Sequence, residues 1–230
     1  MNVAIIPARG GSKRIEGKNI KPFVGKPIIA YSILTAIKSG LFDKVVVSTD
    51  SEEISRVAQE FGALVPFMRP EELADDMSPT APVLEHALNW MTKNWELPEY
   101  ACCIYPTAPF LSVKILIEGL STLKKYHCTT SFGVTSFAFP IFRSIKIEND
   151  GVVSMFWPEF ELTRSQDLQE AYHDAGQFYW LNAKKFLSEP RLYASDSRVV
   201  ILPRKLVQDI DTPEDWEVAE YMFKAQFLKG

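Results

Sequence analysis

A loop rich in glycine and cations follows the first apolar run of the chain. Between Arg9 and Lys26 there are six basic residues and one acidic residue, Glu16, which gives a local charge of +5 in a chain whose net charge is −4. Two glycines and a serine at positions 10–12 add backbone N–H groups beside these cations. Because anions bind where backbone N–H groups and cations converge, the loop is predicted to bind phosphate.

This loop carries neither of the two common glycine motifs for nucleotides. A Walker A loop has four residues between its first Gly and the Gly-Lys-Ser/Thr, whereas five residues separate Gly11 from Gly17 and Asn19 replaces the hydroxyl residue. The dinucleotide pattern GxGxxG is also missing from the sequence. P-loop ATPases and Rossmann dehydrogenases are therefore disfavoured.

A pair of carboxylates near the C-terminal end is the second candidate for chemistry. Asp209 and Asp211 are two residues apart, so in an extended segment both project to one side while Ile210 turns toward the core. Carboxylate oxygens are ligands that Mg²⁺ prefers. The alternative is that Asp209 is a surface charge and Asp211 belongs to a helix cap with Thr212.

Strands and helices that alternate along the chain would position these residues. Apolar runs at residues 3–6, 44–49, 64–68 and 100–105 are predicted strands. Helices are expected from Pro27 to Gly40, from a cap at Asp50 to Gly62, from a cap at Ser78 or Thr80 over residues 82–94, and over residues 113–126. This alternation predicts an α/β fold with a parallel sheet, whose ligands gather in the loops after residues 7, 49, 68 and 105.

The pattern changes between residues 130 and 180. Short β-prone pieces at 129–136, 145–148 and 152–156 are separated by proline turns and by Asn149-Asp150-Gly151, which favours a hairpin. This aromatic-rich segment could pack on a second subunit or cover one end of the same sheet. Strands at 178–181 and 199–202 then precede a closing helix that begins at Pro213, with Thr212 and Asp215 as its cap.

Composition bounds the class of protein. A chain of 230 residues with 47% hydrophobic content is long enough for one substantial domain. The cysteines show no disulfide framework, and the three histidines are too spread for a zinc site. Mild acidity argues against nucleic acid as a partner. No signal peptide and no apolar run of the roughly 20 residues that cross a bilayer is seen, so we expect a cytoplasmic protein without membrane contact.

Several motifs in fixed order resemble those of one enzyme family. ARGGSKRIEGKN followed by KP-x-I, VSTD at 47–50, FMRPEELADD at 67–76, PTAPFL at 106–111, RSQDL with AYHDAGQFYW between 164 and 180, and QDIDTPEDW at 208–216 are similar to the cytidylyltransferases that activate nine-carbon acidic sugars. The blocks at 67–70 and 173–177 look more like the pseudaminate branch than the sialic acid branch. Tyr105 stands where the sialic acid enzymes typically carry Gln.

The resemblance implies a Rossmann-like nucleotidyltransferase fold and a homodimer. On this hypothesis residues 1–230 form one domain with a mostly parallel central sheet, helices on both faces, and a small β-rich insertion at about 135–175 for dimerisation and the sugar site. The implied reaction is attack of the sugar's anomeric hydroxyl on the α-phosphate of CTP, assisted by Mg²⁺. Pseudaminic acid is the expected sugar; N-acetylneuraminic, legionaminic or ketodeoxyoctonic acid, or a non-catalytic CTP-binding regulator, are the alternatives.

The resemblance also implies roles for individual residues. The nucleotide-binding set is Arg9, Gly10, Gly11, Ser12, Lys13, Lys18, Asn19, Arg69 and Thr80. The catalytic set is Arg9, Lys18 and Asp211, and the metal set is Asp209 and Asp211. The sugar-binding set is Arg164, Gln166, His173, Gln177, Phe178 and Tyr179, with Arg164 reaching a neighbouring subunit's site. For His173 a sugar contact, a role as base and a packed hydrogen-bonding residue all remain open.

Overall fold

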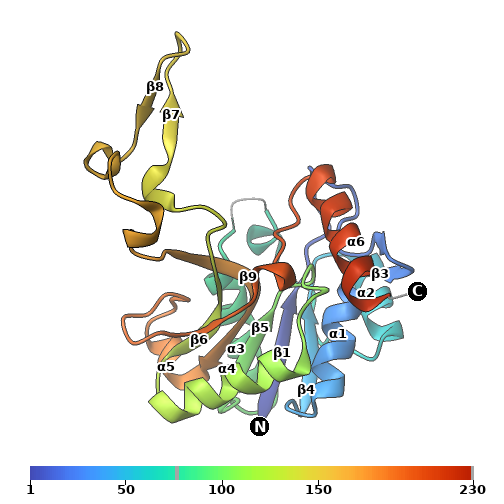
Figure 1. The fold of residues 1–230 in the computed structure, drawn as a ribbon. Helices are drawn as coiled ribbons and strands as arrows, with labels where there is room; N and C mark the ends of the chain where they lie inside the picture. The colour runs from blue at the N-terminus through green and yellow to red at the C-terminus, as the bar shows by residue number, and fades with distance from the viewer. Residues whose placement is uncertain (76–77, 229–230) are drawn as a thin grey trace.

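Strand β1 (Asn2–Pro7) lies inside a six-stranded sheet in the computed structural model, which describes residues 1–75 and 78–228 (Figure 1). It pairs in parallel with β4 (Lys44–Ser48) and β5 (Tyr100–Ile104). Successive side chains of a strand point to opposite faces of its sheet. Ala4 and Ile6 accordingly join one buried cluster, and Val3 and Ile5 join another. An all-apolar run is therefore what a strand covered on both faces requires.

The other half of the sheet contains its one reversed strand. The order is β10-β6-β9-β5-β1-β4. Strand β9 (Tyr172–Asn182) runs antiparallel to both β5 and β6 (Thr130–Ser136), while β10 (Arg198–Ile201) is parallel to β6. The predicted mostly parallel α/β sheet is thus confirmed, and β9 is longer than the strand predicted at 178–181.

Helices cover both faces of the sheet. On one face α1 (Ile28–Ser39), α2 (Glu52–Glu60) and α4 (Val113–Tyr126) contribute to a single hydrophobic cluster. On the other face lie α3 (Thr80–Asn94) and α5 (Ala183–Ser188). A third cluster forms under α6 (Pro213–Phe227) and contains Ile210, so the segment that carries the acidic pair is anchored by a buried side chain.

Several short elements complete the described chain. They are the strand pair β2 (Pro22–Phe23) and β3 (Lys26–Pro27), the strand pair β7 (Ile145–Ile147) and β8 (Val153–Met155), and the 3-10 turns η1 (Glu71–Leu73), η2 (Ile141–Arg143), η3 (Pro158–Phe160), η4 (Ser165–Asp167) and η5 (Arg204–Leu206).

Two predicted helix caps need correction. The cap of α2 is Ser51, whose hydroxyl accepts from the N–H of Ile54, and not Asp50. The residue before α3 is Pro79, so neither Ser78 nor Thr80 caps that helix. The Asp50 carboxylate instead accepts a hydrogen bond from the N–H of Gly10 in the glycine loop, and the Thr80 hydroxyl is hydrogen-bonded to the hydroxyl of Tyr105. The predicted cap of α6 is confirmed, because Thr212 and Asp215 form a reciprocal capping box.

The predicted third strand at 64–68 is also wrong. The structure shows only two isolated parallel bridges there, Val46 with Leu64 and Thr49 with Met68. Pro66 lies between the bridges and has no N–H to donate. Leu64 and Met68 are also about 40% exposed, as is usual beyond the last full strand of a sheet. Asp76, at the end of the 67–76 motif, lies outside the described residues.

The chain leaves the sheet between β6 and β9. Figure 1 shows β7 and β8 standing away from the sheet as a hairpin arm, which we define as residues 137–171. The predicted hairpin turn is confirmed: β7 and β8 pair antiparallel, and Gly151 has a φ of +84°, which favours glycine. Among the described residues no helix combines the length and apolar character that crossing a bilayer requires.

Candidate active site

The glycine-basic loop begins where β1 ends and is held against the start of α2. The N–H of Gly10 donates to Oδ1 of Asp50 at 2.9 Å. A Cβ at position 10 would come within 3.1 Å of the Cβ of Ser51, so glycine permits this close approach. Asn19, which is 5% exposed, donates through Nδ2 to the carbonyl of Arg9 at 2.9 Å. These contacts fix both ends of the loop.

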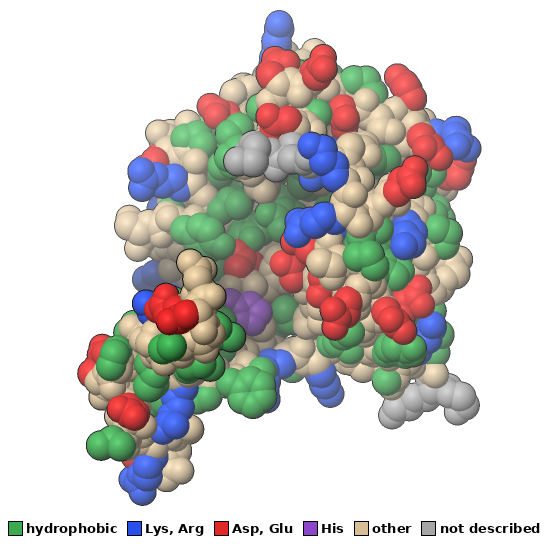
Figure 2. Space-filling view, turned by 90° about the horizontal axis from the view of Figure 1, so that it is seen from above, with side chains coloured by type: hydrophobic (Ala, Val, Ile, Leu, Met, Phe, Trp, Pro, Cys, Tyr) green, Lys and Arg blue, Asp and Glu red, His purple; other side chains and the backbone are tan. Residues whose placement is uncertain are grey.

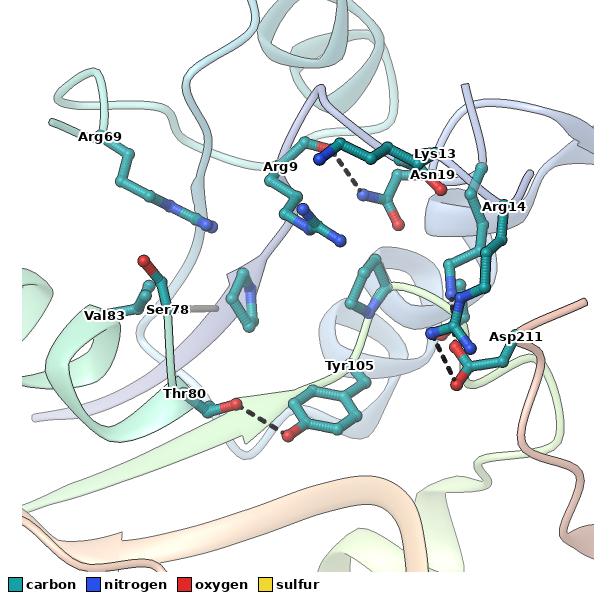
Figure 3. Close-up of a pocket in the computed structure, with 15 residues that line it drawn as sticks. Arg9, Lys13, Arg14, Asn19, Arg69, Ser78, Thr80, Val83, Tyr105 and Asp211 are labelled. Carbon is teal, nitrogen blue, oxygen red and sulfur yellow. Dashed lines mark hydrogen bonds and ion pairs between the residues drawn. The ribbon is translucent and has the colours of Figure 1, made fainter. Parts of the chain in front are cut away.

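The loop forms one wall of a cavity of about 420 Å³ at the carboxyl ends of the strands. Five cationic side chains line this nucleotide-side pocket: Arg9, Lys13, Arg14, Lys18 and Arg69. Figure 3 labels four of them, Arg9, Lys13, Arg14 and Arg69, around the pocket. Ser12, Asn19, Thr80 and Tyr105 line it as well. Figure 2 shows a hollow on this face with cationic side chains at its edge. The pocket is therefore suited to a ligand with several negative charges.

The structure brings together seven of the nine residues predicted to bind nucleotide. Gly10 and Gly11 are the exceptions, because they shape the loop and do not line the pocket. Arg14 lines the pocket although the motif comparison did not single it out; its place among the loop cations was the available signal. These positions agree with a nucleotide site.

Arg69 is a buried cation beside the pocket. It is 6% exposed, and its Nε donates to the hydroxyl of Ser48 at 3.2 Å while another guanidinium nitrogen donates to the Ser48 carbonyl. Burial lowers the pKa of Arg69 to about 10, with Asp50 opposing and Arg9 adding to that shift. The guanidinium still carries its charge at neutral pH.

Asp211 lies at the other side of the same pocket. Its two carboxylate oxygens contact Nζ of Lys18 at 3.2 Å and a guanidinium nitrogen of Arg14 at 3.0 Å. Lys18 also donates to the carbonyl of Ile210 at 2.7 Å. A residue near the N-terminus is therefore tied to the segment that precedes α6. The wall of the pocket is thus formed by residues that are 193 positions apart in the sequence.

Asp209 points to a second cavity, of about 520 Å³, which we call the sugar-side pocket. Its lining is Tyr105, Thr135, Ser136, Ala138, His173, Asp174, Ala175, Gly176, Arg204, Val207, Gln208 and Asp209. Tyr105 lines both pockets and so marks the border between them. Desolvation and the nearby carboxylate of Asp211 both raise the pKa of Asp209. Two carboxylates that repel each other at a pocket border are a suitable place for a cation.

Asp209 and Asp211 are too few to hold a metal ion by themselves, but they suit Mg²⁺ bound together with a substrate. Within the described residues no group of three or more His, Cys, Asp and Glu side chains could hold a metal. Magnesium, however, commonly binds through one or two carboxylates, waters and substrate phosphates. The alternative for Asp211 as a helix cap finds less support, because the side chain that caps α6 belongs to Thr212.

Three of the predicted sugar-binding residues lie on β9 and are buried. Phe178 is 1% exposed and packs inside the core, and the Tyr179 hydroxyl donates to Asp174. Gln177 donates through Nε2 to the carbonyl of Leu206, and its Oε1 has no partner in the described part of the chain. None of the three lines either pocket. In this structure the Phe178 ring packs in the core and does not face either pocket.

The other predicted sugar-binding residues are separated from one another. His173 lines the sugar-side pocket, with Nδ1 2.9 Å from the carbonyl of Asp174 and its ring against Phe137. Arg164 and Gln166 are on the arm; Arg164 pairs with Asp167 at 2.7 Å, and both line neither pocket. Neither residue therefore contributes to the lining of the sugar-side pocket in its own chain.

Asp174 is a site residue that the sequence did not reveal. Its carboxylate accepts from the hydroxyls of Tyr179 and Tyr193 and from the N–H of Gly176 at 2.7 Å. Burial, together with hydrogen bonding to Asp174, raises the pKa of Tyr193 to about 12. Tyr193 is thus a neutral donor at physiological pH. Three donors therefore engage the carboxylate of Asp174.

Comparison with known proteins agrees with this geometry. A family model described as cytidylyltransferase matches residues 3–226. The chain is 43% identical over 223 residues to the pseudaminic acid cytidylyltransferase of Campylobacter jejuni, covering 97% of this chain and 96% of that protein. It is 32% identical over 220 residues to the N-acylneuraminate cytidylyltransferase of Escherichia coli, covering 94% of this chain and 51% of that protein.

A solved structure supports the fold. That of CMP:2-keto-3-deoxy-manno-octonic acid synthetase, in complex with CTP, matches with a TM-score of 0.69 over 98% of this chain and 99% of that chain. The two chains are 17% identical, so the likeness concerns the fold alone.

Proposed function

The chain belongs to the cytidylyltransferase family, and on that premise we propose that it couples CTP to a nine-carbon acidic sugar, giving the CMP-sugar and pyrophosphate. The observation that carries this proposal is the pairing of two pockets at Tyr105. One pocket is lined by five cations and suits a triphosphate; the other is lined by hydroxyl, carboxyl and guanidinium groups and suits a polar sugar. Asp209 and Asp211 stand where the two substrates would meet.

Pseudaminic acid is the proposed sugar. Identity of 43% to a pseudaminic acid enzyme, against 32% to an N-acylneuraminate enzyme, supports this choice. N-acetylneuraminic, legionaminic and ketodeoxyoctonic acids remain alternatives for the same reaction. A non-catalytic CTP-binding regulator is less well supported, because a sensor would need neither the acidic pair nor a second polar pocket.

The reaction joins the anomeric oxygen of the sugar to the α-phosphorus of CTP while the bond to pyrophosphate breaks. Such a transfer depends on alignment and on stabilising the charge of the phosphoryl oxygens. Arg9 and Lys18 line the nucleotide-side pocket and would stabilise this charge, Arg9 as a planar fork and Lys18 as a point charge. Lys18 is oriented for this task by its bond to the carbonyl of Ile210.

Asp209 and Asp211 would hold Mg²⁺ together with phosphate oxygens of CTP. When bound there, Mg²⁺ would supply charge neutralisation at the phosphate oxygens and lower the pKa of a coordinated hydroxyl. Lys18 and Arg14, which form ion pairs with Asp211 in the structure, would hold its carboxylate at the pocket.

A homodimer formed through the arm is part of the proposal. Ile145, Ile147 and Phe156 on the arm are more than half exposed, which is unusual for apolar side chains unless another surface covers them. In a dimer Arg164 and Gln166 would reach the partner's sugar. Light scattering of Ile147→Glu should show a monomer, whereas the exposed helix variant Ile117→Glu should keep the wild-type mass. Equal masses for the wild type and Ile147→Glu would contradict this arrangement.

One assay tests the proposed function. The protein is incubated with CTP, Mg²⁺ and each of pseudaminic, N-acetylneuraminic, legionaminic and ketodeoxyoctonic acid, and products are identified by mass. We expect CMP-pseudaminic acid and an equal amount of pyrophosphate. No CMP-sugar from any acid would overturn the enzyme proposal. A cytoplasmic location belongs to the same proposal, because the substrate CTP is an intracellular nucleotide.

A further inference from the structure

Arg204 is the one Lys or Arg side chain among the described residues that line the sugar-side pocket. The five other site cations, which lie on the glycine loop and at position 69, line the nucleotide-side pocket. Within residues 1–75 and 78–228, no hydrogen bond or ion pair engages the Arg204 guanidinium. An arginine at a pocket with its donors available is suited to a carboxylate, which it can bind through two parallel N–H groups.

Two acidic side chains line the same pocket, Asp174 and Asp209. Asp174 accepts from two tyrosine hydroxyls and one backbone N–H. Asp209 is close enough to Asp211 for the two carboxylates to interact, and the pair is the proposed Mg²⁺ site. A negatively charged sugar would be repelled by these carboxylates unless a cation in the same pocket offsets them. Arg204 is the side chain available for this purpose.

We propose that Arg204 binds the carboxylate of the acidic sugar and selects for a charged substrate; this inference rests on the proposed function. A nonulosonic acid carries its carboxylate on the anomeric carbon, the same carbon that bears the reacting hydroxyl. The group that binds the carboxylate must therefore lie close to the group that receives the hydroxyl. Arg204 and Asp209 line the same pocket, which meets this requirement.

The turn that carries Arg204 is anchored to the sheet. Leu206, at the end of η5, receives a hydrogen bond from the buried side chain of Gln177, and its own N–H donates to the carbonyl of Pro203 at 2.8 Å. Gln177 is 2% exposed and lies on β9. Gln177 thus helps to position the turn that holds Arg204.

A comparison of the acid with its neutral ester tests the inference. The probes are the nonulosonic acid that gives product with the wild type and its methyl ester, each assayed by pyrophosphate release at saturating CTP. The wild type should prefer the acid. Arg204→Gln should raise the KM for the acid roughly 10- to 150-fold, the size of a hydrogen bond to a charged group, and leave the ester unchanged. Arg204→Lys should restore part of the preference.

The controls separate a local from a general effect. Lys205→Gln removes a neighbouring charge that lines neither pocket and should behave as the wild type. The affinity of Arg204→Gln for CTP alone, measured by calorimetry, and its thermal midpoint should also be unchanged. An Arg204→Gln variant that keeps the wild-type preference for the acid over the ester would overturn the assignment. The same holds if Arg164→Gln, and not Arg204→Gln, abolishes that preference.

Failure of the proposed function would give a different result. If the wild type made no CMP-sugar from any acid, the enzyme proposal and the role of Arg204 would both fall. If the wild type turned over and Arg204→Gln retained its discrimination, only the role of Arg204 would fall.

Discussion

The hydroxyl groups of Thr80 and Tyr105 lie 2.8 Å apart, so a residue of the nucleotide-side pocket is hydrogen-bonded to the tyrosine that lines both pockets (Figure 3). Thr80 is the first residue of α3, and Tyr105 follows the end of β5. The Tyr105 ring also packs against Tyr179, with 5.6 Å between ring centroids. Burial raises the pKa of Tyr105, so its hydroxyl stays protonated at neutral pH.

A double-mutant cycle on this pair should show coupling. Thr80→Val and Tyr105→Phe each remove one hydroxyl and keep the shape of the side chain. Each single substitution should lower kcat/KM. The double variant should be little worse than either single variant, with a coupling energy of about 0.5–1.5 kcal/mol. The measurement is kcat/KM for CTP in the two single variants, the double variant and the wild type. Additive losses would show that the hydrogen bond does not organise the pocket border.

Loss of the Arg9 guanidinium should slow the reaction strongly. Arg9 lines the nucleotide-side pocket on the loop that Asn19 and Gly10 hold in place. Removing a donor that stabilises transition-state charge typically costs roughly 10²–10³ in kcat. Arg9→Ala should show a loss of this size in pyrophosphate release. Arg56→Ala, which removes an exposed arginine on α2, is the matched control and should be unaffected. Near-normal turnover of Arg9→Ala would contradict its role.

The Asp196 carboxylate should stabilise the fold in a pH-dependent way. Burial alone would raise its pKa, but hydrogen bonds from the N–H and hydroxyl of Thr129 and the charge of Lys185 lower it overall. A lowered pKa means that stability is present above the unfolded value of 3.8 and lost as pH falls through the folded value. Asp196→Asn should therefore lower the thermal midpoint at pH 7 and much less at pH 3. If Asp196→Asn lowered the thermal midpoint by the same amount at pH 7 and pH 3, the charge of Asp196 would not be the cause.

Local patterns predicted much of the fold and the nucleotide side of the site. Residues 3–6 form a continuous apolar run, which a strand buried on both faces needs, and Gly40 ends α1 with a φ of +64°. The loop cations are neighbours in sequence, so a loop that turns back on its strand brings them together. The expected inward turn of Ile210 is also confirmed, because Ile210 is 1% exposed in the cluster under α6. The carboxylates on either side of it line different pockets, Asp211 the nucleotide-side pocket and Asp209 the sugar-side pocket.

The sugar side could not be predicted in the same way, because long-range pairing builds it. Strand β9 lies between β5 and β6 in a sheet covered on both faces, so Phe178 and Tyr179 are buried whichever way they point. The same pairing places Asp174 opposite Val134. Arg204 gave no local signal, since an arginine after a proline and before a lysine has the pattern of an exposed turn. Long-range contacts hold that turn beside the sheet, among them the hydrogen bond between Gln177 and Leu206 and the packing of Leu206 on the core.

Asp211 should be needed for the response to Mg²⁺. Its carboxylate contacts Lys18 and Arg14, so two roles are conceivable: holding these cations or binding the metal. Asp211→Asn keeps the size of the side chain and removes its charge. Pyrophosphate release by this variant should fall roughly 10²–10³-fold, and half-maximal activity should need more Mg²⁺ than in the wild type. The wild type should lose activity in EDTA and regain it when Mg²⁺ is added. Glu214→Gln, which removes an exposed charge in the first turn of α6, is the control. If Asp211→Asn were slower but needed no more Mg²⁺ than the wild type, Asp211 would hold Lys18 and Arg14 in place, and other groups would bind the metal.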